Sequence, residues 1–208
     1  MSDPIIEELV DRYPVLGNCA SSIREAVDLL TTCLENGGTL LICGNGGSAA
    51  DAEHIVGELM KSFELPRPVD TQTRAALNDD RLASMLQGAL RAIALSGSGP
   101  LATAIANDIS AETVFAQQVL GYGRPGDVLW GLSTSGNSLN VLNAAKVAHA
   151  RGMHVFGMTG TGGGALASHC DVCVGVPETE TWKVQELHFP IYHAICRILE
   201  RRFFGRPE

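Results

Sequence analysis

The chain has 208 residues, of which 45% are hydrophobic and 18% are charged, with a net charge of −8. This composition is typical of one soluble globular domain and excludes intrinsic disorder, collagen and a disulfide-stabilised miniprotein. Because no basic stripe is present, we expect no nucleic-acid partner. The basic cluster near the C-terminus is interpreted as a solvated helix end: Arg197, Arg201, Arg202 and Arg206.

Segments for membranes, export or redox chemistry are not expected. No apolar stretch approaches the ~18 residues that a membrane span requires. The N-terminus carries acids where a secretory signal carries lysines and an apolar run, so we expect a cytoplasmic protein. The pair Cys170 and Cys173 is a lone CxxC in a valine-rich run, and we interpret it, like the other cysteines, as buried free thiols.

Five short apolar runs predict buried strands, with helical patterns between them. The strands are expected at 39–43, 92–95, 127–133, 154–159 and 171–176, and the helices at 21–35, 51–63, 111–120, 139–151 and 183–203. Strands that alternate with helices predict a three-layer α/β fold, with a parallel sheet covered on both faces. Functional residues in such folds gather beyond the carboxyl ends of the strands.

The first strand ends in the sequence Cys-Gly-Asn-Gly-Gly-Ser at 43–48, and a helix follows at once. Glycines let the backbone approach a ligand closely, and a helix N-terminus offers free N–H groups. The loop also matches the dinucleotide fingerprint GxGxxA, but the next strand does not follow within the ~30 residues of a βαβ unit. A ligand-binding loop and a plain structural turn both fit this segment.

The helix after this loop carries His54 and Glu58 four residues apart, on one face. This spacing suits two ligands of one metal, or a base with its orienting partner. Taken alone, this spacing more often belongs to a His–Glu pair on a helix surface that has no function.

Residues 65–91 interrupt the alternation of strands and helices. They open with Pro66-Arg-Pro68 and then offer short helical patterns at 73–77 and 82–90. We interpret the stretch as a helical insertion in a single domain of residues 1–208.

Hydroxyl side chains follow the third strand, in the sequence Ser-Thr-Ser-Gly-Asn-Ser at 133–138. With the free N–H groups of the next helix, they can bind a phosphate without a lysine. A simple N-cap needs only one such residue, so four hydroxyls favour an anion site.

The last helix carries Gln185, His188 and His193. Gln185 and His193 lie on nearly one face but about 12 Å apart along the axis. One metal could just span them if Pro190 kinks the helix. His188 faces elsewhere and fits a packing histidine equally well.

Four motifs in this order resemble the sugar-isomerase (SIS) domain family, and within it most closely the phosphoheptose isomerases. They are Cys-Gly-Asn-Gly-Gly-Ser at 43–48, Ala-Asn-Asp at 106–108, Ser-Thr-Ser-Gly-Asn-Ser at 133–138 and Gln-Glu-Leu-His at 185–188. The resemblance covers about 18–203. It implies one flavodoxin-like domain with a five-stranded parallel sheet, a homotetramer with active sites at subunit interfaces, and a bound zinc.

Matched by position, the resemblance also implies the site residues. The substrate-contacting positions hold Asn45, Gly46, Gly47, Ser48, Glu58, Asn107, Asp108 and Gln185, and the phosphate positions hold Ser133, Thr134, Ser135 and Ser138. The zinc positions hold His54, Glu58, Gln185 and His193. Glu58 and His193 also match the acid/base pair of the family.

The activity implied by the resemblance interconverts sedoheptulose 7-phosphate and D-glycero-D-manno-heptose 7-phosphate. Aldose–ketose isomerisation moves a proton between C1 and C2 through an enediol, so a carboxylate base and a second acid/base group are needed. A metal or an imidazole near the oxygens can stabilise the enediolate charge.

Two other kinds of protein resemble this sequence. The DnaA initiator-associating protein is a binding module that lacks the acid/base pair, whereas this chain keeps Glu58 and His193. A phosphosugar-sensing regulator carries a DNA-binding domain, for which we expect no room in the short N-terminus. Two departures from the enterobacterial isomerases concern the identity of the sugar. One is the longer stretch at 65–91, and the other is Trp182 in place of an aspartate, for which Glu178 or Glu180 could substitute.

Overall fold

The computed structural model describes residues 3–205, and its five strands form one sheet in the order β2-β1-β3-β4-β5. The strands are β1 (Leu40–Cys43), β2 (Ala92–Ala94), β3 (Val128–Leu132), β4 (His154–Thr159) and β5 (Val172–Gly175). Every neighbouring pair is parallel. The predicted strands are therefore confirmed, and four of them are one residue shorter at one or both ends.

Helices connect the strands, and those predicted from periodicity are present. The α-helices are α1 (Pro4–Arg12), α2 (Ala20–Glu35), α3 (Gly47–Met60), α4 (Thr71–Leu77), α5 (Asp80–Met85), α6 (Gly99–Ile105), α7 (Val114–Tyr122), α8 (Leu139–Ala150), α9 (Gly164–Ala167) and α10 (Thr181–Phe204). Shorter turns are η1 (Pro14–Cys19), the π-helix η2 (Ala106–Ser110) and η3 (Ala111–Thr113). The sequence analysis did not predict α1, α6 or α9.

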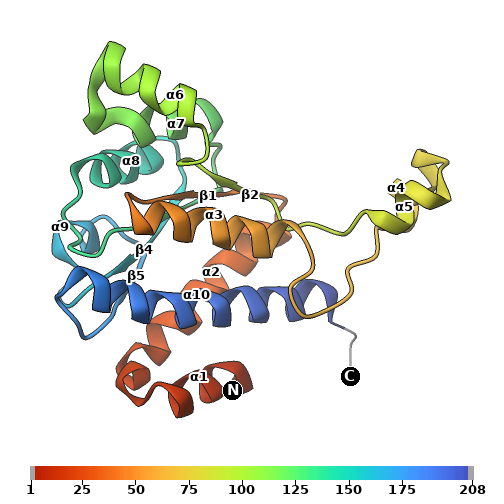
Figure 1. Ribbon diagram of the computed structural model, residues 1–208, viewed down its shortest axis with the longest axis horizontal. Helices are drawn as coiled ribbons and strands as arrows, with labels where there is room; N and C mark the ends of the chain where they lie inside the picture. Colours follow the sequence, from red (N-terminus) through yellow and green to blue (C-terminus); the bar gives the residue numbers. More distant parts are fainter. Residues whose placement is uncertain (1–2, 206–208) are drawn as a thin grey trace.

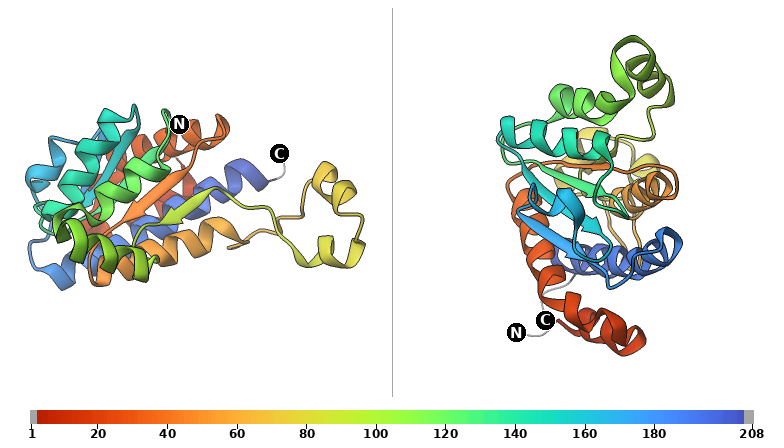
Figure 2. Two further views of the ribbon diagram at one scale, coloured as in Figure 1. Left: turned by 90° about the horizontal axis from the view of Figure 1, so that it is seen from above. Right: turned by 90° about the vertical axis from the view of Figure 1, so that its left-hand side faces the viewer.

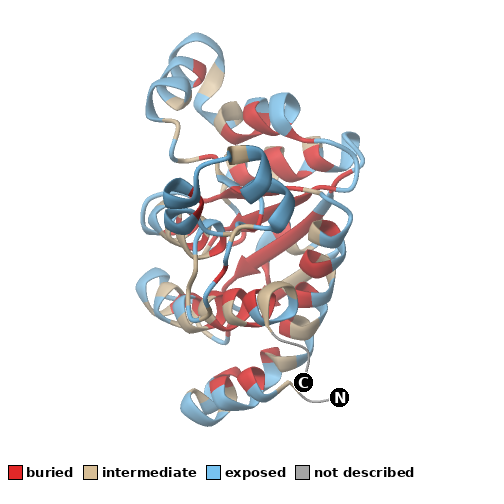
Figure 3. Ribbon diagram, turned by 90° about the vertical axis from the view of Figure 1, so that its right-hand side faces the viewer, coloured by how far each residue is buried: buried red, intermediate tan, exposed pale blue. Residues whose placement is uncertain are grey.

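The sheet lies between two layers of helices, as the three-layer prediction requires (Figures 1 and 2). Successive strand residues point to opposite faces. In β1, Leu40 and Ile42 therefore join the core formed with α2, α3 and α10, whereas Leu41 and Cys43 join the core formed with α7 and α8. The strands β1, β3 and β4 are buried apart from the first residue of β4, whereas the edge strands β2 and β5 are only partly buried. Figure 3 shows buried residues gathered in the centre of the domain.

The strand order places a topological switch point beyond the carboxyl ends of β1 and β3. The connection from β1 runs through α3 to β2, and the connection from β3 runs through α8 to β4 on the other side. Because α3 and α8 pack on opposite faces of the sheet, the chain diverges at this point. Ligands of doubly wound sheets bind at such switch points. Two loops begin here, which we call the glycine loop (residues 43–48) and the hydroxyl loop (residues 133–138).

Residues 65–91 form an arm that projects from the domain, coloured yellow in Figure 1. Its end consists of α4 and α5, and no residue of α4 is buried. The prediction of a helix over 82–90 is wrong after Met85. The chain becomes extended there because Gln87 pairs with Pro68 in an antiparallel bridge as it returns toward β2.

An ion pair with no exposed surface holds the base of this arm. Arg67 Nε lies 2.8 Å from Glu200 Oε1. Glu200 also accepts hydrogen bonds from the backbone N–H groups of residues 63–65. Arg67 donates to the carbonyl oxygens of Glu58 and Leu59 at the end of α3. Burial alone would raise the pKa of Glu200, but these donors outweigh burial and the pKa is lowered.

The helix α10 continues through Pro190 without a break. Among residues 3–205, no helix is long and apolar enough to cross a membrane.

The arginines near the end of α10 are ion-paired: Arg197 with Glu8 and Glu64, Arg201 with Glu64, and Arg202 with Asp28. Arg206, the last member of the predicted cluster, lies outside the described residues.

The six cysteines are free thiols. The burial expected for them is confirmed for Cys19, Cys33, Cys43 and Cys196. It is wrong for Cys170 and Cys173, which are only partly buried because the short strand β5 lies at the edge of the sheet.

Candidate active site

Packing of α10 against α3 brings three of the predicted site residues together. His54 Nε2 lies 3.2 Å from Glu58 Oε1 and 3.5 Å from His193 Nε2. The sequence spacing predicted that His54 and Glu58 share a face of α3. Only the packing of the two helices adds His193 to them. We refer to these three residues as the His–Glu–His cluster.

Glu58 supplies the carboxylate of this cluster, and only 13% of its side chain is exposed. Its two oxygens have different partners, because Oε1 faces His54 and Oε2 accepts a hydrogen bond from Lys61 Nζ at 3.1 Å. An imidazole and an ammonium group therefore both contact this carboxylate, which is a residue type that can act as a base.

His193 lies between two aromatic rings. Its ring centroid is 4.3 Å from that of Phe189 and 5.4 Å from that of Phe63. Burial, and then the nearby His54, lower the pKa of His193 from its ordinary value. At neutral pH the ring is therefore a neutral imidazole, which can both donate and accept a proton.

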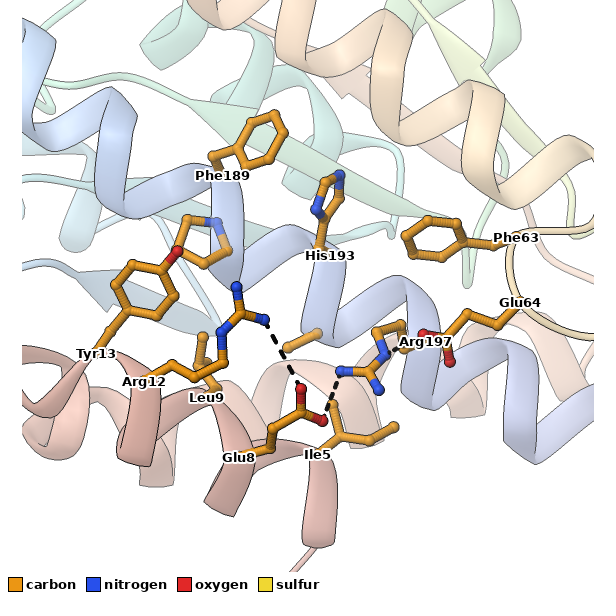
Figure 4. A pocket seen from close by; sticks show the side chains of 12 residues that line it. Ile5, Glu8, Leu9, Arg12, Tyr13, Phe63, Glu64, Phe189, His193 and Arg197 are labelled. Atoms are coloured by element: carbon orange, nitrogen blue, oxygen red, sulfur yellow. Dashed lines mark hydrogen bonds and ion pairs between the residues drawn. The ribbon is translucent and has the colours of Figure 1, made fainter.

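His193 also lines a cavity of about 280 Å³ between α1 and α10. Figure 4 shows Phe189, His193 and Phe63 along one side of this cavity, and Arg12, Glu8 and Arg197 along the other. Since Glu8 pairs with Arg197 across the floor, the cavity presents both apolar and charged groups next to the imidazole.

Gln185 lies two turns before His193 on α10, against the start of α3. An ideal Cβ at Gly47 would lie only 2.6 Å from the Gln185 Nε2, so glycine leaves room for this amide. Gln185 lines a second cavity of about 510 Å³ together with Asp51 and Trp182. Phe189 lines both cavities.

The predicted zinc ligands are thus only partly assembled. His54, Glu58 and His193 are together, while Gln185 lies at the N-terminus of α3. As the side chains of residues 3–205 stand, no group of three or more His, Cys, Asp or Glu could hold a metal ion. The zinc site stays a prediction.

A pair of amides joins the glycine loop to the first turn of α8, directly after the hydroxyl loop. Asn45 donates to Asn140 Oδ1, and Asn140 donates to Asn45 Oδ1, both at 2.9 Å. Asn45 is exposed, whereas Ser48 is buried behind the loop against Gly44. The predicted substrate residues after β1 therefore border the switch point, and Asn140 is a neighbour that sequence analysis did not single out.

The four predicted phosphate residues gather at the start of α8. Ser133 Oγ lies 3.1 Å from Ser138 Oγ, and Ser135 Oγ accepts a hydrogen bond from the Asn137 N–H. Ser138 is the N-cap of α8, but its side chain makes no capping hydrogen bond. The first N–H groups of the helix are therefore available to an anion.

A second glycine-rich run, residues 160–164, supports this loop from behind. Gly136 has a φ of +65°, and a side chain there would collide with the carbonyl oxygen of Gly163. Leu166 N–H donates to the Gly136 carbonyl at 2.8 Å. Sequence analysis missed this run, although three consecutive glycines after a strand are a signal for close backbone approach.

Asn107 and Asp108 lie apart from the other predicted residues. Both are exposed on η2, where Asn107 donates a hydrogen bond to Asp108 at 2.7 Å. This segment packs mainly on α6 and η3, on the side of the sheet opposite α10 (Figure 1). Within one chain, the structure does not bring these two residues to the His–Glu–His cluster.

Comparison with known proteins identifies the family. The family model for the SIS domain matches residues 14–89 and 80–160. A phosphoheptose isomerase of Rhodospirillum rubrum is 40% identical over 190 residues, which cover 91% of this chain and 90% of the relative. The chain belongs to the SIS-domain phosphoheptose isomerase family. A phosphoheptose isomerase of Akkermansia muciniphila is 36% identical over 95% of this chain and 94% of its own length.

Solved structures of the same family have the same fold. A phosphoheptose isomerase from Francisella tularensis matches with a TM-score of 0.78 at 33% identity, covering 94% of both chains. The phosphoheptose isomerase GmhA from Neisseria gonorrhoeae matches with a TM-score of 0.73 at 37% identity, covering 94% of this chain and 91% of that chain. The resemblance inferred from four motifs is confirmed.

This member of the family has further site residues that the sequence analysis did not name. Asp51 lies on α3 three residues before His54, and Lys61 is the C-cap residue of α3, three residues after Glu58. Helical spacing was therefore a signal for both. Phe189 and Tyr192 gave no such signal, because only the packing of α10 decides which of its faces meets α3.

His188 is a packing residue, one of the two interpretations that the sequence allowed. It is fully buried, and its Nε2 lies 3.1 Å from the carbonyl oxygen of Thr159. Burial lowers the pKa of His188 to about 4. The folded protein therefore keeps this imidazole neutral at pH values where an unfolded chain would protonate it.

Stability should consequently fall as the pH decreases from 6.5 toward 4, with His188 contributing about 1.4 kcal/mol per pH unit. Above pH 6.5 the residue is neutral in both states and contributes no slope. Urea unfolding of the parent and of His188→Gln, which keeps a donor toward Thr159, measures this contribution as the difference in slope. Equal slopes in the two proteins would contradict it.

Proposed function

We propose that this chain is a cytoplasmic aldose–ketose isomerase that interconverts sedoheptulose 7-phosphate and D-glycero-D-manno-heptose 7-phosphate in heptose biosynthesis. The single observation that carries this proposal is the His–Glu–His cluster. Its carboxylate can act as the base that the reaction needs, and its neutral imidazole can act as the acid. The names of the relatives support the same substrate class.

In the ketose-to-aldose direction, Glu58 removes a proton from C1 while His193 gives a proton to the C2 carbonyl oxygen, which forms the enediol. Glu58 then returns its proton to C2, and the hydroxyl on C1 gives its proton to His193 as the aldehyde forms. Both groups end in their starting states, so the cycle balances. The low exposure of Glu58 and the lowered pKa of His193 suit these roles.

The phosphate is held by the hydroxyl loop and by the N-terminus of α8. Hydroxyl groups and backbone N–H groups donate to the phosphate oxygens, and the helix dipole adds a favourable potential. Asn45 and the glycine loop lie beside the start of α8 and bind the sugar hydroxyls next to the phosphate.

Replacement of Ser135 with alanine should weaken phosphosugar binding by about 1 kcal/mol or more, because a hydrogen bond to a charged group is lost. Calorimetry with the phosphosugar measures this as a rise of the Kd of about fivefold. Ser21→Ala, an exposed serine on α2, is the matched control. An unchanged Kd for Ser135→Ala would argue against the phosphate site.

A second copy of the chain completes the site in this proposal, within a homotetramer. Asn107 and Asp108 lie on the side of the sheet opposite α10, so they do not reach Glu58 of their own chain. In addition, Trp182 and Phe189 flank Gln185 with 58% and 44% of their surface exposed. Large apolar side chains exposed next to a polar site are typical of an interface.

Zinc belongs to the proposal as a cofactor held by His54, Glu58, Gln185 and His193. Imidazole and carboxylate donors suit zinc, and a bound zinc would stabilise negative charge on the sugar oxygens. Because Gln185 does not lie at the cluster, zinc binding requires either that side chains move or that the neighbouring subunit supplies part of the ligand set.

Metal analysis of the protein after incubation with zinc should give about one zinc per chain, and His193→Ala should lose most of it, since a ligand is removed. His149→Ala changes an exposed histidine of α8 and should keep the metal. Zinc content of nil, or content that His193→Ala leaves unchanged, would show that the four residues form only an acid/base and hydrogen-bonding site.

The activity itself is tested by incubation with sedoheptulose 7-phosphate, with NMR used to detect the aldose product. Formation of the aldose supports the proposal. Binding without any product would instead indicate a binding module of the DnaA initiator-associating kind.

A further inference from the structure

Cys170 and Cys173 lie beside the glycine-rich run of residues 160–164. Cys173 is on β5, in register with Gly157 of β4. An ideal Cβ at Gly157 would lie 2.5 Å from Cys170 Sγ and 3.6 Å from Cys173 Sγ. Cys173 Sγ is also 3.7 Å from an ideal Cβ at Gly163. Both sulfurs therefore gather around one position that the missing side chain of Gly157 leaves open, and we call these two residues the thiol pair.

The thiol pair is more accessible than the other cysteines of the chain. Both of its members are partly exposed, whereas the other four cysteines are buried. A hydrogen bond from Cys170 lowers the pKa of Cys173 to about 7, and the same hydrogen bond, together with burial, raises the pKa of Cys170. A thiolate is the reactive form in exchange with a disulfide, so Cys173 is the nucleophile of the pair. From the sequence we expected no redox chemistry because both thiols were taken to be buried, and their exposure removes that reason.

The helix α9 connects the thiol pair to the hydroxyl loop. Cys170 Sγ lies 3.2 Å from the carbonyl oxygen of Leu166 in α9. A thiol has one hydrogen, so Cys170 can give it either to this oxygen or to the sulfur of Cys173. On the other side of α9, the Leu166 N–H donates to the carbonyl oxygen of Gly136 at 2.8 Å. One residue of α9 therefore contacts both Cys170 and the hydroxyl loop.

A second contact from α9 holds the shape of the hydroxyl loop. The Ala165 N–H donates to Asn137 Oδ1 at 3.0 Å, and the Asn137 amide group donates to the Ser135 carbonyl oxygen at 2.9 Å. Ser135 is one of the predicted phosphate residues. The position of the phosphate-binding hydroxyls therefore depends on the position of α9.

A disulfide between Cys170 and Cys173 would disturb this connection. A disulfide bond is only ~2.05 Å long, so the two sulfurs would have to approach each other. Cys170 would also lose its hydrogen and could no longer donate to the Leu166 carbonyl oxygen. The strand β5 lies at the edge of the sheet and pairs only with β4, which leaves it the most easily shifted of the strands around this site. Oxidation would therefore remove one attachment of α9, and with it some of the support of the hydroxyl loop.

We propose that the thiol pair is a redox modification site that reacts with a low-molecular-weight disulfide and weakens phosphosugar binding when it is oxidised. The Cys173 thiolate attacks one sulfur of the small disulfide, which releases one small thiol and leaves a mixed disulfide on Cys173. Cys170 then loses its proton and attacks the Cys173 sulfur, which releases the second small thiol. Two electrons and two protons thus pass from the thiol pair to the small disulfide. Disulfides of cytoplasmic proteins are mostly of this reversible kind.

Mass spectrometry tests the formation of the disulfide. Residues 152–183 form one tryptic peptide, which contains both members of the thiol pair and no other cysteine. After incubation with glutathione disulfide, and alkylation in denaturant, this peptide should carry no alkyl group and should be lighter by two hydrogens. Cys43 and Cys196 are internal controls that should stay reduced, because both are fully buried. Excess dithiothreitol should return the peptide to its reduced mass.

Single variants test the order of the two steps. In Cys170→Ser the thiol that resolves the mixed disulfide is missing, so glutathione should remain attached to Cys173. In Cys173→Ser the nucleophile is missing, and reaction of the remaining thiol should be at least about tenfold slower. Thermal unfolding of each variant shows that it remains folded.

Calorimetry with sedoheptulose 7-phosphate tests the effect on binding. The Kd of the oxidised protein should be at least about threefold higher than that of the reduced protein, which is the effect of losing one neutral hydrogen bond. Dithiothreitol should restore the original Kd. The double variant Cys170→Ser, Cys173→Ser is the matched control, and glutathione disulfide should not change its Kd. If this variant does not fold, the reversal by dithiothreitol in the parent serves the same purpose.

Alkylation of both thiols after incubation with glutathione disulfide would overturn the proposal, as would faster reaction of Cys170 than of Cys173. A disulfide that leaves the Kd unchanged would overturn the effect on binding. That effect rests on the proposed function, whereas the mass of the peptide does not. A reduced protein that binds no phosphosugar would therefore overturn the proposed function, while the mass spectrum still decides whether the thiol pair is a redox site.

Discussion

Replacement of Glu58 with glutamine is expected to lower turnover at least about 10²-fold while phosphosugar binding persists. Glutamine has the shape of glutamate, but its amide cannot accept a proton from carbon. The amide can still face His54 and Lys61, which now contact the two carboxylate oxygens. The structure of the site should therefore remain while the base is lost.

Steady-state kinetics in both directions, with calorimetry for binding, measure this effect. Glu53→Gln is the matched control, because Glu53 lies on the same helix with an exposed side chain. Turnover near that of the parent in Glu58→Gln would exclude Glu58 as the base. A loss of binding equal to the loss of turnover would instead indicate that Glu58 holds the substrate.

Replacement of Arg67 with alanine is expected to lower the free energy of unfolding by about 3–5 kcal/mol. The variant leaves the carboxylate of Glu200 buried without its cation, and it leaves the carbonyl oxygens of Glu58 and Leu59 without a donor. The ring of Phe204, 4.8 Å from the Arg67 guanidinium, also loses its contact. Urea unfolding at neutral pH measures the change.

The chain contains a matched control for this ion pair. Arg74 and Asp80 lie 2.7 Å apart, almost the same distance as Arg67 and Glu200, but 51% and 88% of their side chains are exposed. Solvent screens such a pair, so Arg74→Ala should cost at most about 1 kcal/mol. Equal costs for Arg67→Ala and Arg74→Ala would show that burial of the first pair does not matter.

This ion pair also links stability to the candidate site. Glu200 is on α10 two turns after His193, and Arg67 binds the backbone of Glu58 at the end of α3. Together they fix the ends of the two helices that carry the cluster. Loss of the pair should therefore reduce turnover as well as stability, through the relative position of α3 and α10.

Much of the fold could be predicted from the sequence, because local patterns encode it. The strands are short runs of apolar residues between glycines, and parallel strands buried on both faces need such runs. The helices α2, α3, α8 and α10 follow helical periodicity over several turns. The helix α1 was missed even though Asp3 and Pro4 form a typical helix start, with Asp3 accepting from the Ile5 N–H.

Part of the site could also be predicted, where its residues are close in the sequence. His54 and Glu58 share a helix face because four residues make about one turn. The hydroxyl loop is a single continuous segment at the end of a strand. The four motifs identified the family because their order along the chain is itself a sequence property.

The rest depended on tertiary structure, because no local pattern specifies which faces of two distant helices meet. Packing of α10 on α3 placed His193 at His54, left Gln185 at Gly47, and brought Tyr192 to Asp51. It also paired Arg67 with Glu200, 133 residues apart in the sequence. Such contacts follow from the burial of whole helix faces against one sheet. The sequence by itself determined the strands, the main helices between them, the loops at the strand ends and the family, and the packing of those elements decided which side chains act together.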